Sequence, residues 1–142
     1  MTDLESIASR MLDAYTRAVA AKDVDALMEL YDPNVRVFDA WGTWSHEGAD
    51  AWRRALEGWL TSLGTEQASA LFEDTQVVVH GEMALLTTIV TYAGFTAEGE
   101  ALRSMQNRLT WVMQFEGQKL RIIHEHTSAP IGLEDMQAIL QR

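Results

Sequence analysis

The stretch that decides the fold is residues 80–118, HGEMALLTTIVTYAGFTAEGEALRSMQNRLTWVMQFEGQ. It holds two long runs rich in β-branched and aromatic residues, and a glycine flanked by polar residues stands before, between and after them, at Gly81, Gly99 and Gly117. Short glycine-centred breaks between such runs are typical of hairpin turns. With similar runs on either side, the expected strands are residues 70–79, 83–95, 102–115 and 120–128. The second half of the chain therefore predicts an antiparallel sheet.

The first half of the chain shows helical periodicity instead. Residues 3–21 repeat apolar side chains at three- and four-residue spacing. Asp23 is placed to cap a second, short helix that carries Tyr31 and ends at the turn 32–34. The remaining expected elements are a strand at 35–39, a third helix at 50–63 and a short terminal helix carrying Leu133, Met136, Ile139 and Leu140. This order predicts an α+β fold in which three helices cover one face of a curved antiparallel sheet.

Composition limits the kinds of partner. The chain has 142 residues, which favours one domain over residues 1–142. Its 11 Lys and Arg stand against 21 Asp and Glu, and the formal net charge of −10 repels phosphate backbones and anionic lipid. The sequence contains no cysteine, no basic-then-apolar leader and no apolar run of the ~20 residues that span a bilayer. We therefore expect a soluble cytoplasmic protein whose partners include neither nucleic acid nor membrane.

Three stretches carry a family resemblance: residues 15–39, GADAW at 48–52, and residues 117–128, which continue into HEHTSAP at 124–130. In this order they resemble the nuclear-transport-factor-2-like superfamily, which includes the SnoaL-like cyclases and the ketosteroid isomerases, over nearly the whole chain. The ending is most similar to the SnoaL-like branch that contains the association domain of calcium/calmodulin-dependent kinase II. The resemblance implies a single domain with a cone-shaped α+β barrel. Because this fold hosts enzymes, binding modules and assembly domains, it leaves the function open.

Asp39 and Tyr15 are the first candidates for catalysis. Asp39 ends a strand beside apolar residues, where lost solvation raises the pKa of a carboxyl and makes it a usable base, unless it only caps the next loop. Tyr15 lies on the apolar stripe of the first helix, as a core residue or as a buried donor. The resemblance to the ketosteroid isomerases implies an oxyanion donor at Tyr15 and a proton-shuttling base at Asp39. Those enzymes also carry a carboxylic acid on a later strand, but residues 104–115 contain no Asp or Glu.

The last strand offers a second polar group. His124, His126 and Ser128 alternate, so a regular strand points all three to one face, and Arg108 and Thr110 alternate likewise on the preceding strand. Facing inward, they form a polar floor for a carboxylate or carbonyl group, with the two histidines as further catalytic candidates. The alternatives are a structural hydrogen-bond network and a metal site that adds the strand-end aspartate as a ligand. We expect no metal, because nothing in the sequence fixes that geometry.

Tryptophans supply candidate pocket walls. Trp52 and Trp59 share the stripe of the third helix, which is compatible with core packing or with a ligand-facing wall. Trp41 and Trp44 fall in a loop, where they are expected to line a pocket mouth or an interface. Tyr92, on the predicted strand 83–95, is a further candidate for contact with the ligand.

Two classes of function remain. The sequence contains no G-x-S-x-G, P-loop or G-x-G-x-x-G motif, and His46 and His80 are expected to be exposed loop residues. The first class is a cofactor-free enzyme that moves a proton next to a carbonyl of a small apolar substrate, by isomerisation, cyclisation or dehydration. The second is a non-catalytic module for ligand binding or association.

A homodimer is also expected. A sheet that is covered by helices on one face leaves its other face open, and an apolar open face usually finds a partner across a two-fold axis. Alternation predicts that this open face holds some of Leu109, Trp111, Met113, Phe115 and Ile123.

Overall fold

Three helices lie on one side of the molecule. The structure is a computed structural model and describes residues 3–142. Its helices are α1 (Asp3–Ala21), α2 (Val24–Met28) and α3 (Ala49–Ser62). The side chain of Asp23 accepts a hydrogen bond from the N–H of Ala26 at 3.0 Å and caps α2, as the sequence predicted. Within the described residues, no helix has the length and hydrophobicity needed to cross a membrane.

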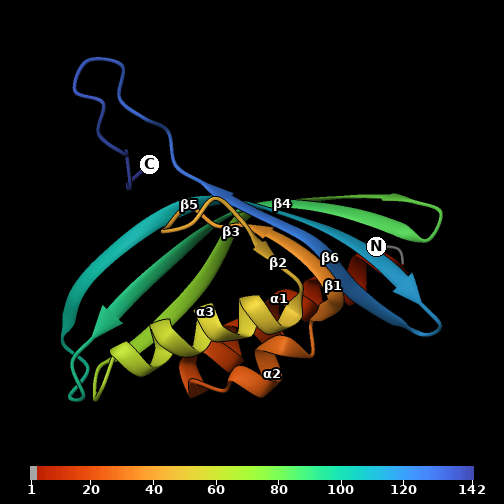
Figure 1. Cartoon of the computed structure of the whole chain (residues 1–142), viewed down its shortest axis with the longest axis horizontal. Helices are drawn as coiled ribbons and strands as arrows, with labels where there is room; N and C mark the ends of the chain where they lie inside the picture. Colours follow the sequence, from red (N-terminus) through yellow and green to blue (C-terminus); the bar gives the residue numbers. More distant parts are fainter. Residues whose placement is uncertain (1–2) are drawn as a thin grey trace.

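Six strands form one curved sheet that wraps around the helices (Figure 1). The strands are β1 (Tyr31–Phe38), β2 (His46–Glu47), β3 (Gln67–His80), β4 (Met83–Phe95), β5 (Ala101–Glu116) and β6 (Lys119–Ser128). Their order in the sheet is β2-β1-β6-β5-β4-β3. The α+β class and the four-strand meander are confirmed. However, β1 runs parallel to β6, so the sheet is mixed rather than wholly antiparallel.

Strand β1 begins earlier than the sequence predicted. Tyr31 and the three residues after it belong to β1 instead of ending α2. The predicted turn persists inside the strand, because the pairing with β6 jumps from Tyr31 to Arg36. The side chain of Asp32 accepts a hydrogen bond from the N–H of Asn34 at 2.8 Å within this irregular stretch. Pro33 fits there because a bulged strand needs no ladder hydrogen bond from that residue.

The hydrophobic core lies between the helices and the concave face of the sheet. Trp111, Met113 and Leu109 of β5 are buried there against Tyr15 of α1 and Leu27 of α2. The sequence predicted that the open face holds some of five residues, and this was wrong for these three of β5. Alternation along β5 turns them toward the helices and turns the residues between them outward.

Strand β6 contains one extra residue. In its pairing with β5, Met113 lies opposite Ile122 and Val112 lies opposite His124, so Ile123 has no partner. This irregularity is a β-bulge, and the alternation of side chains changes phase where the bulge interrupts the strand. The regular alternation that the sequence predicted for the last strand therefore fails at its middle.

After the bulge, the residues of β6 therefore point to the faces opposite to those that regular alternation predicts. Glu125 and Thr127 are buried on the concave face. His124, His126 and Ser128 lie on the outer face, and the prediction that they point into the barrel was wrong.

The C-terminal residues do not form the predicted helix. After β6 the chain turns back through a bridge between Ile131 and Ala138, and the carbonyl of Leu140 then accepts a hydrogen bond from the N–H of Gln106 at 2.7 Å. Met136 has a φ of 59°, a left-handed conformation that an α-helix does not continue through. Figure 1 shows this segment standing off the convex side of the sheet.

We predict that β6 tolerates deletion of Ile123 but not deletion of His126. Ile122 already lies opposite Met113 and His124 lies opposite Val112, so removal of the unpaired residue between them closes the ladder and leaves Glu125 and Thr127 on the concave face. Deletion of His126 instead forces either Glu125 or Thr127 outward. The Tm measured by circular dichroism is expected to fall by a few degrees for the first variant and by roughly 10 °C or more for the second, because buried hydrogen bonds are lost. A larger loss for the deletion of Ile123 than for the deletion of His126 would contradict the assigned register.

Candidate functional site

A cavity of about 460 Å³ lies between α1, α3 and the concave face of the sheet. Cavities of this size typically hold small molecules. Its walls are largely aromatic and include Trp41, Trp52, Trp59 and Tyr92. Polar side chains from α1, from β2, from the residue after β1 and from two long strands also line it. They include Tyr15, Asp39, His46, Asn107 and Glu125.

Glu125 is the buried acid of the cavity. It is 1% exposed. Its Oε1 atom accepts hydrogen bonds from the hydroxyl of Tyr31 at 2.6 Å and from the indole N–H of Trp111 at 2.8 Å. Burial raises the pKa of Glu125 to about 7; the two hydrogen bonds oppose this effect, and the nearby charge of Asp39 adds to it. Glu125 therefore exchanges a proton near neutral pH.

Asp39 lies directly after β1, where the chain enters the loop at the cavity. The hydroxyl of Thr127 donates a hydrogen bond to its Oδ1 at 3.0 Å, and the same hydroxyl oxygen accepts the N–H of Ala40 at 2.8 Å. Burial raises the pKa of Asp39, while Thr127, the backbone N–H groups of Trp41 and Ala40, and the charge of His46 lower it in part. A carboxyl that is fixed in place and poorly solvated has the properties of a general base.

Tyr15 and Tyr92 form a pair of buried hydroxyls. Their oxygens are 2.9 Å apart. Burial raises the pKa of both groups above the ordinary value for tyrosine, so both are neutral at physiological pH. One hydroxyl donates to the other, which leaves the second proton of the pair for another acceptor. The ring of Tyr15 packs edge-on against Phe72, and Tyr92 packs against Trp59, so both rings are fixed.

Two buried polar atoms in the cavity wall have no hydrogen-bond partner within residues 3–142: Nε1 of Trp52 and Oδ1 of Asn107. Trp52 comes from α3, and Asn107 comes from the concave face of β5. An unpartnered buried polar atom costs about 1–3 kcal/mol. Such atoms are uncommon in folded proteins, and two in one cavity make it the candidate functional site.

The structure brings several of the predicted residues together and excludes others. Tyr15, Asp39, Trp41, Trp52 and Tyr92 all line the cavity. Whether they act on a ligand stays a prediction.

The remaining predicted residues lie elsewhere. Arg108 donates a hydrogen bond to the hydroxyl of Ser128 at 3.0 Å on the outer face, where Thr110 pairs with His126. Trp44 is 97% exposed in its loop and does not line this cavity, so its expected place at a pocket mouth or an interface stays a prediction. The expectation that the other four residues line the pocket was wrong, because the bulge in β6 and the alternation of β5 turn them away from it.

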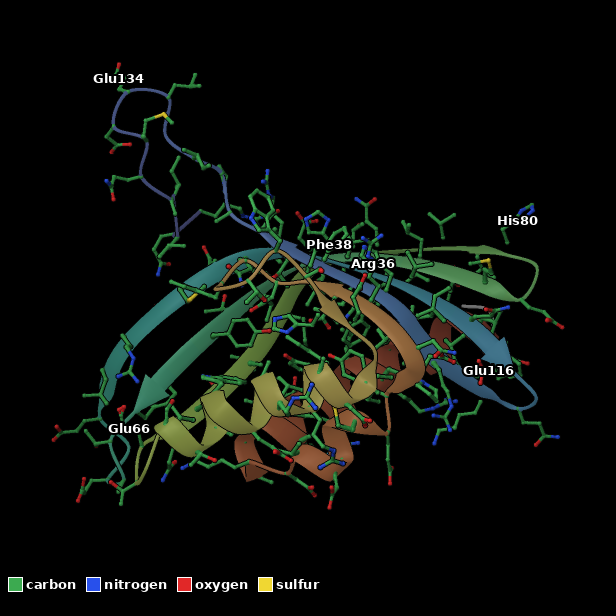
Figure 2. All side chains as sticks on the ribbon, viewed as in Figure 1. Arg36, Phe38, Glu66, His80, Glu116 and Glu134 are labelled. Atoms are coloured by element: carbon green, nitrogen blue, oxygen red, sulfur yellow. The ribbon has the colours of Figure 1, made fainter. Side chains whose placement is uncertain are left out.

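An aromatic cluster on the outer face accounts for the two histidines. The rings of His124 and His126 pack edge-on against Phe38 at 5.1 and 5.5 Å. Nδ1 of His124 donates to the carbonyl of Arg36 at 2.7 Å, and the Arg36 guanidinium lies over the Phe38 ring. Figure 2 shows Arg36 and Phe38 on the side of the sheet away from the helices.

Sequence reasoning missed three polar residues of the cavity. Glu125 is an acid on the strand next to 104–115, but regular alternation assigned it to the outer face. His46, expected to be an exposed loop residue, is half-buried, lines the cavity and packs against Trp52 with ring centroids 5.2 Å apart. Asn107 stands among apolar inward residues of β5, and that exception to the pattern was the available signal. In the part of the chain that the structure describes, no three His, Asp or Glu side chains are grouped to hold a metal ion.

Comparisons with known proteins agree with this fold. The family model described as SnoaL-like domain matches residues 9–132. An NTF2-like protein of unknown function from Pseudomonas putida KT2440 is similar, with a TM-score of 0.86 and 22% identity over 100% of this chain and 97% of that one. A putative calcium/calmodulin dependent protein kinase II association domain from Xanthomonas campestris has a TM-score of 0.73 and 18% identity over 87% and 85%.

A protein from Catenulispora acidiphila, solved in complex with S-DNPA, has a TM-score of 0.74 and 11% identity over 88% of this chain and 92% of that one. No curated protein matches the sequence at the significance required. At these identities the solved structures confirm the nuclear-transport-factor-2-like cone fold that the sequence predicted, and the fold alone.

We predict that Glu125 makes the protein less stable as the pH rises toward neutrality. Its pKa is raised to about 7 in the folded state from 4.5, so between these values the folded chain binds a proton that the unfolded chain has lost. The free energy of unfolding then falls with rising pH by an order-of-magnitude total of about 3 kcal/mol, and it levels off above pH 7. Asp39, with its raised pKa, acts in the same direction.

Urea unfolding at pH 5 and pH 8 measures this slope. Glu125→Gln keeps an oxygen acceptor for Tyr31 and Trp111 but cannot ionise, so most of the slope should disappear. The matched control is Glu134→Gln in the exposed C-terminal segment, which should leave the slope as in the wild type. An unchanged slope in Glu125→Gln would contradict the assigned pKa.

Proposed function

The chain belongs to the SnoaL-like domain family, and from this premise we propose that its cavity binds a small, mostly apolar ring compound and moves a proton next to a carbonyl group of that compound. The observation that carries the proposal is Asp39, a carboxyl with a raised pKa that is held at an aromatic cavity containing a pair of neutral tyrosine hydroxyls. A base and neutral donors in one poorly solvated space suit proton transfer at carbon.

The proposed reaction needs only groups of this chain. The carboxylate of Asp39 removes a proton from the carbon next to the carbonyl, and the electrons of that C–H bond form a C=C bond as the carbonyl becomes an enolate. The enolate oxygen accepts a hydrogen bond from the Tyr15–Tyr92 pair or from neutral Glu125, whose protonation burial favours. Asp39 then returns the proton to a carbon of the product, so the sum is an isomerisation.

A ligand-binding module without catalysis is the second candidate. It uses the same cavity, and the small molecule bound by the Catenulispora acidiphila protein supports ligand binding in this fold. The two candidates differ in one property, because only the enzyme accelerates proton exchange at a carbon of the bound compound.

We also propose that a second copy of the chain covers the outer face of the sheet. Val78, Leu85 and Val112 lie side by side on neighbouring strands, in register. Val78 is 61% exposed and Leu85 is 40% exposed. This row continues at His124 on β6, which is paired with Val112. An apolar row across an open sheet face favours association across a two-fold axis.

We predict that the protein accelerates exchange of the protons next to the carbonyl of 2-tetralone, and that Asp39→Asn removes this activity. Asparagine keeps the shape and the hydrogen bond but cannot accept the proton, so the exchange rate should fall by about 10²–10⁴-fold. Proton NMR in D₂O, corrected for exchange in buffer alone, measures the rate. The Tm of Asp39→Asn should hold or rise, because a buried amide is less costly than a buried carboxylate.

The control for this experiment is His126→Gln, which alters a residue on the outer face of β6 and should change the exchange rate by less than a factor of about two. Exchange that is unaffected by Asp39→Asn would exclude Asp39 as the base. Bound 2-tetralone that exchanges no faster than in buffer would favour the non-catalytic module.

We predict that light scattering at tens of micromolar gives the mass of two chains, and that Leu85→Glu gives the mass of one. The substitution places a charge in the middle of the apolar row, where a second copy would have to desolvate it. Leu102→Glu is the matched control, because Leu102 has a similar exposure but lies at the start of β5, away from the row. A wild-type protein of single-chain mass would contradict the dimer.

A further inference from the structure

The C-terminal arm, residues 130–139, is an ordered loop that projects from the convex side of the sheet (Figure 1). The N–H of Gly132 donates to the carbonyl of Gln137 at 2.8 Å, and the N–H of Met136 donates to the carbonyl of Gly132 at 3.0 Å. Oδ1 of Asp135 accepts the N–H of Gln137 at 3.0 Å, and the lack of a side chain at Gly132 leaves room for that carboxylate. The arm is therefore held in one shape by its own contacts.

The tip of this arm presents large apolar side chains to water. Leu133 is 98% exposed and Met136 is 74% exposed. Because the loop is already ordered, a partner that covers these side chains does not have to pay for ordering it. Met136 also has a φ of 59°, a left-handed conformation that residues with a side chain adopt mainly where the surrounding structure imposes it. An ordered, projecting and apolar tip has the properties of a contact surface.

The charge of the arm defines the kind of surface that fits it. Glu134 and Asp135 lie between the two apolar side chains of the tip, and no Lys or Arg occurs from residue 129 to residue 141. Figure 2 shows Glu134 at the far end of the arm. A complementary surface is therefore apolar and positively charged. Such a surface is uncommon on a chain with a formal net charge of −10.

A groove of about 650 Å³ on the outer side of β1 has both properties, and we call it the outer groove. Its lining includes Arg36, Phe38 and Trp44. The indole of Trp44 is almost wholly in water, and the Arg36 guanidinium lies 4.7 Å from the centroid of the Phe38 ring. Arg36 contacts Glu47 at 3.1 Å, but both side chains are well exposed, and a guanidinium has enough donors to bind a second carboxylate.

The outer groove adjoins the apolar row that we propose a second copy covers. The ring of His124, at the end of that row, packs against Phe38. Phe38 is paired with His126 near the end of β6, and the arm begins soon after β6 ends at Ser128. The groove and the arm thus lie at the same end of β6. A two-fold axis near that end places the arm of each copy beside the groove of the other.

We infer that the C-terminal arm of a second copy docks in the outer groove. Its apolar tip covers Phe38 and Trp44, and its acidic residues lie beside Arg36. The outer groove and the cavity share three lining residues, Asp39, Gly42 and Thr43, so the docked arm covers the outside of the segment that carries the proposed base. The inference goes beyond the proposed proton transfer, and it rests on the proposed dimer only for the presence of a second copy.

Crosslinking tests the contact, because the chain contains no cysteine. The double variant Gln137→Cys, Thr43→Cys leaves the apolar tip and Trp44 intact. It is treated with a short bis-maleimide reagent, and peptide mass spectrometry locates the link. We expect a product of two-chain mass that is joined between positions 137 and 43. The matched control, Gln137→Cys with His80→Cys, should give no corresponding product, because Figure 2 shows His80 at the end of the sheet away from the arm.

Charge exchange tests the polar part of the contact. Arg36→Glu and Glu134→Arg should each raise the dissociation constant of the two-chain form by roughly two- to five-fold, and the two together should restore it. Leu133→Ser should raise it by roughly ten-fold or more, because it removes an apolar contact at the centre of the docked tip. Sedimentation over a dilution series measures these constants. Glu98→Arg is the control for net charge, since Glu98 is exposed in the turn between β4 and β5.

The outcomes separate this inference from the other proposals. A wild-type protein of two-chain mass with no link between positions 137 and 43, or charge variants whose effects only add, overturns the docked arm and leaves the apolar row as the dimer contact. A link between these positions within one chain means that the arm closes on its own groove, which also overturns the inference. A wild-type protein of single-chain mass overturns the dimer as well. The exchange of 2-tetralone is measured separately and decides the proposed reaction. All of the substituted side chains are exposed, so we expect each variant to fold.

Discussion

The unpaired residue Ile123 determines which side chains of β6 face the cavity. Because β6 gains one residue there, Glu125 turns inward to two buried donors, and Thr127 turns inward to hold Asp39. Glu125 itself and Thr127, which holds Asp39, therefore both lie beyond the bulge. A regular strand of the same sequence would turn Glu125 outward and present imidazole rings to the core instead. The bulge thus links the register of the sheet to the electrostatics of the site.

Desolvation dominates the electrostatics of that site. Two hydrogen bonds favour the ionised form of Glu125, yet burial outweighs them and its pKa is raised to about 7. The charge of Asp39 raises the pKa of Glu125 further, so losing a proton from one carboxyl makes losing one from the other harder. The tyrosine hydroxyls nearby stay neutral for the same reason of burial. The cavity therefore combines a buried carboxyl whose protonated form is favoured by burial with neutral hydroxyl donors.

Local sequence signals predicted those parts of the structure that depend on interactions between residues close together in the sequence. The cap at Asp23, the periodicity of α1 and α3, and the glycine turns placed the helices and the meander, and with them Tyr15 and Trp52 in the cavity wall. The parallel pairing of β1 with β6 is a long-range contact with no local signature. The bulge at Ile123 carries no glycine or proline, so nothing marked the change of phase that brings Glu125 inward.

Asn107 and Glu125 are polar exceptions to the core pattern that line one cavity, and their position bears on function. An apolar residue at position 107 would continue the inward stripe of β5 and remove an unpartnered atom, and an apolar residue at position 125 would avoid the cost of a buried acid. Defects tolerated at random would be scattered over the core. Asn107, Glu125 and Trp52 instead line the same cavity as Asp39 and the tyrosine pair. The chain gives up stability where a ligand can restore it, which is the pattern expected of a binding site rather than of a purely structural core.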